Sequence, residues 1–173
     1  LAPLIAQAIN KDTSIYKDIK YSKNHLKEIE LAAKMHDIGK IGISDRILNK
    51  AGKLTEEEFE VIKRHPIIGA SILKNLALHQ DEPIVKVAYE ICRWHHERYD
   101  GGGYPDGLKG EQIPISAQIV SLADVYDALV NDRVYKKAMP YSEVEDYIIS
   151  QSGKAFDPKI VNIFINSKEK LKA

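Results

Sequence analysis

Four of the six histidines in this chain form, with two aspartates, a set of residues whose types suit metal binding. The set consists of His36, Asp37, His65, His95, His96 and Asp124. Imidazole nitrogens combined with carboxylate oxygens are ligands for Zn, Fe, Mn or Ni, whereas core packing does not require them. Lys40 follows closely, and its ammonium could steady a phosphodiester or protonate a leaving group. The set therefore predicts a metal-dependent hydrolase.

Each of these residues also has a purely structural interpretation. His36 could end a helix, where a histidine interacts favourably with the helix dipole, and His65 could be a surface or helix-end residue. Neighbours on a helix diverge by about 100°, so one of His95 and His96 could be buried and the other solvated. At a helix end both could instead face one site, each toward a different metal. Asp124 has apolar neighbours, where a carboxylate is costly unless it is paired or binds metal.

A glycine-rich segment follows the paired histidines. Residues 100–113 contain five glycines and one proline, which predicts a loop. Glycines let a backbone approach a ligand closely, and Tyr104 could stack on a base, because every base has a π-face. A packed tyrosine in an ordinary turn is the alternative. Further along, Arg133 and Lys136 could contact phosphates, with a solvated helix end as the alternative.

The composition narrows the class of protein. A length of 173 residues with 44% hydrophobic residues fits one domain with a real core. The 25 basic and 25 acidic residues balance, which argues against a broad polyanion-binding surface and against a nucleic-acid polymer as partner. The single cysteine excludes an internal disulfide. No apolar run approaches the roughly 20 residues needed to cross a membrane.

The elements that must position the set are predicted to be helices. Apolar residues recur at helical spacing along most of the chain, and no segment alternates as a strand would. Start signals are capping boxes at Thr55 and Ser142 and prolines at first helical positions, with Asp157 as an N-cap. The predicted helices cover residues 2–10, 24–35, 45–48, 55–64, 66–76, from 83 to the paired histidines, and 114–132, with two more near the end. We expect an all-α bundle without a significant sheet.

Taken together, the strings resemble the HD-GYP family, a subgroup of the HD superfamily of metal-dependent phosphohydrolases. The match runs from about residue 30 to 157 and rests on HDIGKIG, GKLTEEEF, KRHPIIGASIL, HHERYDGGGYP, and LADVYDAL with DRVY. The resemblance implies an HD-type helical bundle with a glycine-rich GYP loop. It also implies metal-dependent hydrolysis of the bacterial messenger cyclic di-GMP to pGpG, GMP or both, by a hydroxide that the metal activates.

The resemblance also assigns roles to residues. It implies two or three divalent ions, Fe or Mn with Zn and Ni as alternatives, and Asp37 bridging two of them. The implied metal ligands are the six residues of the set. The implied substrate contacts are Lys40, Gly103, Tyr104, Pro105, Arg133 and Lys136, with Lys40 and Asp37 in catalysis.

One departure concerns the third ion. Family members usually carry a further metal-binding histidine, often with a glutamate, on a helix upstream of the HD pair, and nothing here matches it. His25 lies eleven residues before His36, about 16 Å along a continuous helix. Metal–nitrogen bonds are only ~2.1 Å long, so His25 is interpreted as structural. We expect residues 1–173 to be one domain cut from a longer signalling protein.

Two other functions stay open at this point. A non-catalytic module could bind a cyclic dinucleotide or a diguanylate cyclase (GGDEF) domain, and an HD phosphohydrolase could act on another nucleotide. The resemblance further implies a bacterial cytoplasmic protein with an upstream sensory or receiver domain, and a homodimer is one of the open oligomeric states.

Overall fold

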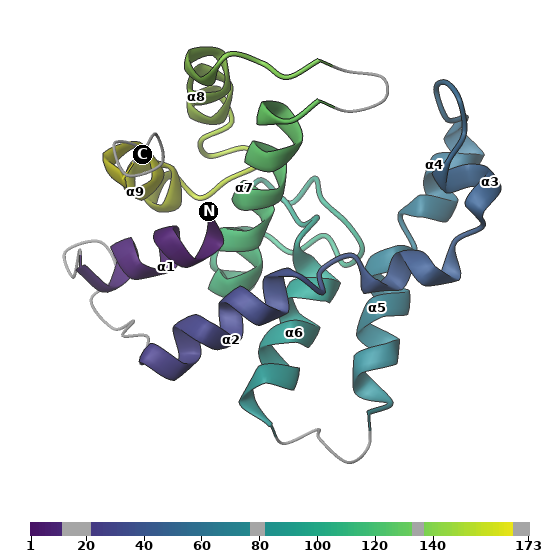
Figure 1. The fold of residues 1–173 in the computed structure, drawn as a ribbon, viewed down its shortest axis with the longest axis horizontal. Helices are drawn as coiled ribbons and strands as arrows, with labels where there is room; N and C mark the ends of the chain where they lie inside the picture. The colour runs from purple at the N-terminus through teal and green to yellow at the C-terminus, as the bar shows by residue number, and fades with distance from the viewer. Residues whose placement is uncertain (12–21, 77–81, 133–136, 168–173) are drawn as a thin grey trace.

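The computed structural model describes residues 1–11, 22–76, 82–132 and 137–167. Within these ranges the chain forms helices and no strand, which confirms the all-α prediction (Figure 1). The first elements are α1 (Ala2–Lys11), α2 (Lys23–Ala33), the 3₁₀ helix η1 (Ile38–Gly42), α3 (Asp45–Leu48), α4 (Glu56–Ile62) and α5 (His65–Lys74). They are followed by α6 (Pro83–Trp94), the 3₁₀ helix η2 (Gly110–Gln112), α7 (Ile115–Val130), α8 (Tyr141–Ser150) and α9 (Pro158–Ser167).

Two of the predicted helix starts are confirmed by their capping bonds. The Thr55 hydroxyl accepts a hydrogen bond from the Glu58 N–H at 3.2 Å, and the Glu58 carboxylate accepts one from the Thr55 N–H at 2.8 Å. The Asp157 carboxylate accepts a bond from the Lys159 N–H at 2.8 Å. These bonds satisfy N–H groups that the first turn of a helix leaves unpaired.

The capping box predicted at Ser142 is wrong. Helix α8 begins at Tyr141, directly after Pro140, so Ser142 lies inside the first turn. A Ser-x-x-Glu spacing is also compatible with a helix interior, and the fixed φ of a proline sets the entry instead. Within the predicted loop 100–113, residues 110–112 form the short helix η2.

Helix α6 forms the centre of the bundle and packs against α2, α5 and α7. Figure 1 shows it between α2 and α5, while α3 and α4 extend away from the other helices. Its residues Ile91 and Cys92 are fully buried, beside Ile29 of α2, Leu73 of α5 and Leu122 of α7. Each buried aliphatic side chain of this size contributes about 1.5–3 kcal/mol. The packed helices thereby fix the C-terminal end of α6, where the paired histidines lie.

Within the described ranges, no helix is both long enough and apolar enough to cross a membrane.

Candidate metal centre

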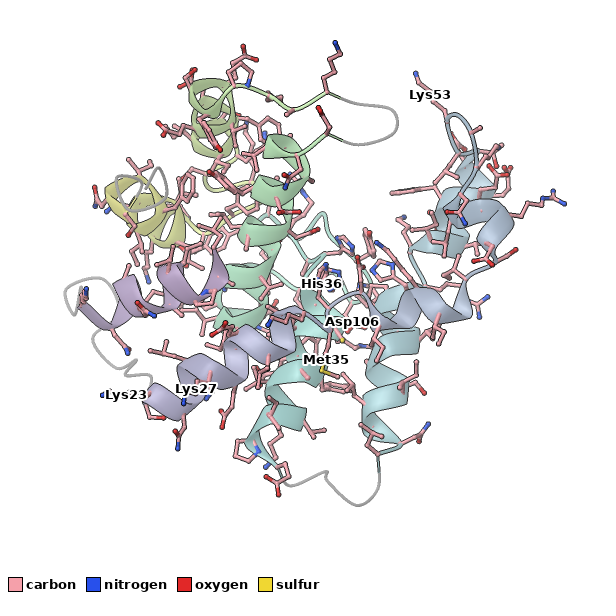
Figure 2. The ribbon with its side chains drawn as sticks, viewed as in Figure 1. Lys23, Lys27, Met35, His36, Lys53 and Asp106 are labelled. Carbon is pink, nitrogen blue, oxygen red and sulfur yellow. The ribbon has the colours of Figure 1, made fainter. Side chains whose placement is uncertain are left out.

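The six predicted metal-site residues come from four parts of the bundle and lie close together. His36 and Asp37 occupy the turn between α2 and η1, and Figure 2 shows His36 toward the middle of the molecule. His65 is the first residue of α5, while His95 and His96 directly follow α6. Asp124 lies on α7.

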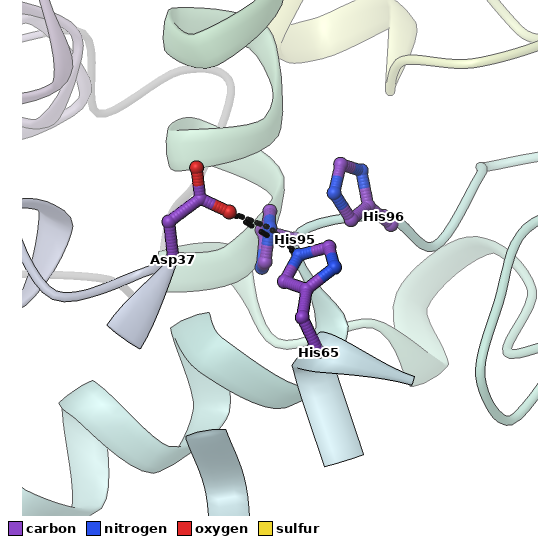
Figure 3. A group of neighbouring side chains, drawn as sticks. All are labelled: Asp37, His65, His95 and His96. Atoms are coloured by element: carbon purple, nitrogen blue, oxygen red, sulfur yellow. Dashed lines mark hydrogen bonds and ion pairs between the residues drawn. The ribbon is translucent and has the colours of Figure 1, made fainter. Parts of the chain in front are cut away.

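Asp37 lies at the meeting point of two groups of side chains. Its Oδ1 atom is 3.2 Å from His65 Nε2 and 3.9 Å from His95 Nε2 (Figure 3). With His96, these residues each offer one ligand atom, and the four atoms lie within 4.8 Å of one another. Both paired histidines therefore join the same group.

The other group lies on the opposite oxygen of the same carboxylate. Asp37 Oδ2 is 3.3 Å from His36 Nε2, and that nitrogen is 3.6 Å from Asp124 Oδ1. A carboxylate whose two oxygens face different ligand groups can bridge two cations. The two oxygens of Asp37 thus face His36 on one side and His65 on the other.

The residues present fit divalent metal ions. His36 Nε2 and Asp37 Oδ1 are buried and make no hydrogen bond, and leaving such atoms unpaired costs free energy unless a ligand completes the site. Nitrogen and carboxylate oxygen ligands suit Mn, Fe, Ni and Zn.

Backbone carbonyls orient three of the imidazoles. The Nδ1 atoms of His36, His65 and His95 lie 2.7, 2.7 and 2.9 Å from the carbonyl oxygens of Ala33, Ile62 and Ile91. A carbonyl can only accept, so each Nδ1 carries a proton, and the neutral form of each ring has its lone pair on Nε2. This is the usual outer contact of a metal-binding histidine.

The surroundings shift the pKa values of the histidines in opposite directions. Burial, with neighbouring His36 and His65, lowers the pKa of His95 to about 4. Burial and the adjacent His95 lower the pKa of His96 to about 2. Burial alone would lower the pKa of His36 too, but its contacts with Asp124 and Asp37 raise it to about 10. His95 and His96 are therefore neutral near pH 7, the form that binds metal.

Asp37 is ionised in the same surroundings. Burial alone would raise its pKa, but contacts with His36, His65 and Lys40 hold it well below the usual range. The Lys40 ammonium lies 2.6 Å from Asp37 Oδ2, and its side chain is 42% exposed. It thus places a positive charge at the solvent-facing edge of the cluster.

The predicted substrate contacts are described only in part. Arg133 and Lys136 lie outside the described residues. For Tyr104 the sequence left open a stacking surface for a base or a packed ring, and its ring stacks on His96, with centroids 4.8 Å apart and planes 26° apart. Lys63, which the sequence analysis did not select, has its ammonium 5.6 Å from the Tyr104 ring centre.

Gly103 packs directly on the turn that carries the paired histidines. A Cβ atom added there would lie 2.3 Å from the Arg98 nitrogen and 2.5 Å from Glu97 Cα. We call residues 101–108 the GYP loop. Only glycine permits this approach of the loop to the turn, and the next residue, Tyr104, contacts His96.

We expect Gly103→Ala to displace the GYP loop. Overpacking of this kind costs about 1–3 kcal/mol, and Mn²⁺ affinity should fall with it because Tyr104 contacts His96. Thermal unfolding and Mn²⁺ titration measure both effects. Gly102→Ala is the matched control, since the nearest atoms to its Cβ would be side-chain atoms, Asp100 Oδ1 at 3.2 Å and Arg98 Nε at 3.8 Å. Equal melting temperatures for the two variants would contradict the prediction.

Sequence reasoning missed one acidic residue next to the site. Glu97 is 2% exposed, and its carboxylate binds backbone N–H groups of the GYP loop. An acidic residue placed just before a glycine-rich loop was the available signal, because such a loop has many N–H groups to satisfy.

His25, interpreted as structural from the sequence, pairs with Glu28, with 2.9 Å between His25 Nδ1 and the Glu28 carboxylate.

Comparison with known proteins finds a matching family and several similar proteins. The family model described as an HD domain matches residues 6–160. A cyclic di-GMP phosphodiesterase of Thermotoga maritima is 46% identical over 91% of this chain and 42% of its own length. The cyclic di-GMP phosphodiesterase response regulator RpfG of Xanthomonas campestris is 43% identical over 91% of this chain and 40% of its own length. The chain thus spans less than half of these relatives.

Two further matches come from Vibrio cholerae. A 3'3'-cGAMP-specific phosphodiesterase is 39% identical over 79% of this chain and 26% of its own length. A crystal structure of a cyclic GMP-AMP phosphodiesterase superposes with a TM-score of 0.57 at 18% identity, covering 99% of this chain and 44% of that one. At that identity the superposition supports the fold alone.

Proposed function

Because this chain belongs to the HD domain family, in its HD-GYP subgroup, we propose that it hydrolyses the phosphodiester bonds of cyclic di-GMP with divalent metal ions. The observation that carries the proposal is the position of Asp37, with one carboxylate oxygen facing His65 and His95 and the other facing His36. The choice of cyclic di-GMP as the substrate rests on the names of the similar proteins. A module that only binds the nucleotide would not need several neutral imidazoles aimed at one carboxylate.

The distances around Asp37 suggest which residues would bind each of two metal ions. We propose that Asp37 is shared, that His65, His95 and His96 bind one ion, and that His36 and Asp124 bind the other. When bound, the ions would polarise the phosphodiester and activate the attacking water. We propose Fe or Mn as the native metal, with Zn and Ni as alternatives.

The chain's own residues would position the substrate and handle protons. The Lys40 ammonium, which pairs with Asp37 at 2.6 Å, would face an oxygen of the scissile phosphate or protonate the leaving oxygen. Tyr104, together with Gly103 and Pro105, would border the bound nucleotide. Arg133 and Lys136 stay predicted phosphate contacts.

Anaerobic hydrolysis tests the proposal. The chain is supplied with Mn²⁺ or Fe²⁺ and given cyclic di-GMP, 3'3'-cGAMP or cyclic di-AMP, and the products are separated by chromatography. We expect pGpG or GMP from cyclic di-GMP as the fastest reaction, and no product from His36→Ala. Folded, metal-loaded protein that binds cyclic di-GMP without turnover would favour the non-catalytic module. If another of these nucleotides is cleaved faster, that nucleotide and not cyclic di-GMP is the preferred substrate.

Several expectations from the resemblance stay predictions. They are a single domain over residues 1–173, an upstream sensory or receiver domain, a GGDEF domain partner, a homodimer and a cytoplasmic location.

A further inference from the structure

Glu97 is a buried acidic residue with no role in the proposed ligand set or substrate contacts. It is 2% exposed. Its carboxylate accepts hydrogen bonds from the N–H groups of Asp106 at 2.7 Å, Gly107 at 3.1 Å and Leu108 at 3.0 Å. A buried carboxylate is costly unless donors replace its water, and hydrogen bonds to an ionised acceptor are the stronger ones. Glu97 therefore attaches the C-terminal end of the GYP loop to the turn after α6.

A second set of bonds attaches the same loop to the last turn of α6. The Asp106 carboxylate accepts from the Arg93 guanidinium at 2.9 and 2.7 Å and from Trp94 Nε1 at 2.8 Å. The two-pronged pairing with Arg93 fixes direction as well as distance. Since Arg93 and Trp94 precede the paired histidines and Glu97 follows them, the loop is held on both sides of His95–His96.

The position of the loop is thereby coupled to His96. The Tyr104 N–H donates to the His96 carbonyl at 3.2 Å, and the Tyr104 ring stacks on the His96 ring. Gly103 leaves no space between the loop and the turn. A shift of the loop would move Tyr104 and remove the surface against which the His96 ring rests.

We propose that Glu97 is a positioning residue for the metal centre. It holds the GYP loop so that Tyr104 keeps the His96 ring directed toward Asp37 and His65. The link to catalysis rests on the proposed function, whereas the link to metal binding does not. If Glu97 served only the stability of the fold, its loss would lower the melting temperature and leave the metal affinity of the folded protein unchanged.

Glu97→Gln tests this proposal with little change in size. Its amide NH₂ cannot accept, so at least one of the three loop N–H groups loses its partner. Well below the melting transition, we expect Mn²⁺ affinity to fall about tenfold, as for other residues that orient metal ligands. The emission of Trp94, the single tryptophan, should shift because its Nε1 bonds to the loop. In the phosphodiesterase assay, kcat should fall more than KM rises.

Glu90→Gln is the matched control. Glu90 also lies on α6 and is part-buried, but its carboxylate binds the Ser116 hydroxyl at 2.7 Å and not the loop. It should keep the Mn²⁺ affinity and the emission spectrum of the unchanged chain. The same result from folded Glu97→Gln would overturn the proposal.

Asp106→Asn covers the case in which Glu97→Gln does not fold. The Asp106 side chain is 32% exposed, so this change weakens the Arg93 and Trp94 bonds without burying an unpaired group. We expect a several-fold loss of Mn²⁺ affinity, and unchanged affinity would overturn the proposal. If the unchanged chain binds Mn²⁺ but cleaves no cyclic di-GMP, the proposed function fails, and the Mn²⁺ titrations still decide the role of Glu97.

Discussion

Asp37→Asn is expected to remove most of the bound metal and to lower cyclic di-GMP hydrolysis by about 10³-fold, the scale of losing a charge-stabilising group. Asparagine keeps the shape of the side chain but lacks the negative charge. Its NH₂ group must also replace one carboxylate oxygen, either the one facing His65 and His95 or the one facing His36. Because an amide NH₂ does not bind metal, the residue can no longer be shared between two ions.

Metal content by elemental analysis, followed by kcat at saturating Mn²⁺, measures this effect. Asp127→Asn is the control, since Asp127 lies on α7 one turn from Asp124 and accepts a hydrogen bond from the Asn131 amide at 2.9 Å. That variant should keep normal metal content and activity. Full metal occupancy and turnover in Asp37→Asn would show that Asp37 does not hold the ions together.

The helical frame could be predicted from local patterns because its causes are local. Thr55 and Asp157 carry the polar atoms that cap their own helices, so the sequence around each position contains the whole interaction. The start of α8 was misjudged because Ser142 has the spacing of a capping residue, while Pro140 sets the true start. Two compatible local signals lie two residues apart there, and only the path of the preceding chain selects between them.

The site could be predicted in its residue types but not in its geometry. That histidines and aspartates would gather followed from their chemistry and from the resemblance. That Asp37 separates His36 and Asp124 from the other histidines depends on how α2, α6 and α7 pack. Glu97 was missed for a different reason, because its partners are backbone N–H groups, which every loop residue possesses, and only its position before a glycine-rich loop marked it.

Of the glycine-to-alanine substitutions described here, Gly39→Ala is expected to disrupt the fold around the site the most. Gly39 lies in η1, two residues after Asp37, and η1 packs on α5. An added Cβ would lie 1.9 Å from the His65 carbonyl oxygen and 2.5 Å from the Gly69 nitrogen. Both are backbone atoms of a helix and cannot rotate away, so η1 must separate from α5.

We expect destabilisation of about 3 kcal/mol, the upper range for overpacking, and a melting temperature lower by roughly 6–12 °C for a domain of this size. Metal binding should fail in protein that is still folded, because the change moves Asp37 away from His65. Calorimetry and Mn²⁺ titration at a temperature where the variant is folded separate the two effects.

Gly42→Ala is the control that tests whether the contact with α5 causes the effect of Gly39→Ala. It lies at the end of the same 3₁₀ helix, but its Cβ would meet the Ile68 side chain, at 3.0 Å, and no backbone atom. A side chain can change rotamer, so this variant should lose little stability and keep its metal. If both variants behave alike, helix propensity rather than the contact with α5 would explain the result. If only Gly39→Ala fails, the distance between Asp37 and His65 depends on a glycine whose missing side chain lets two helices touch.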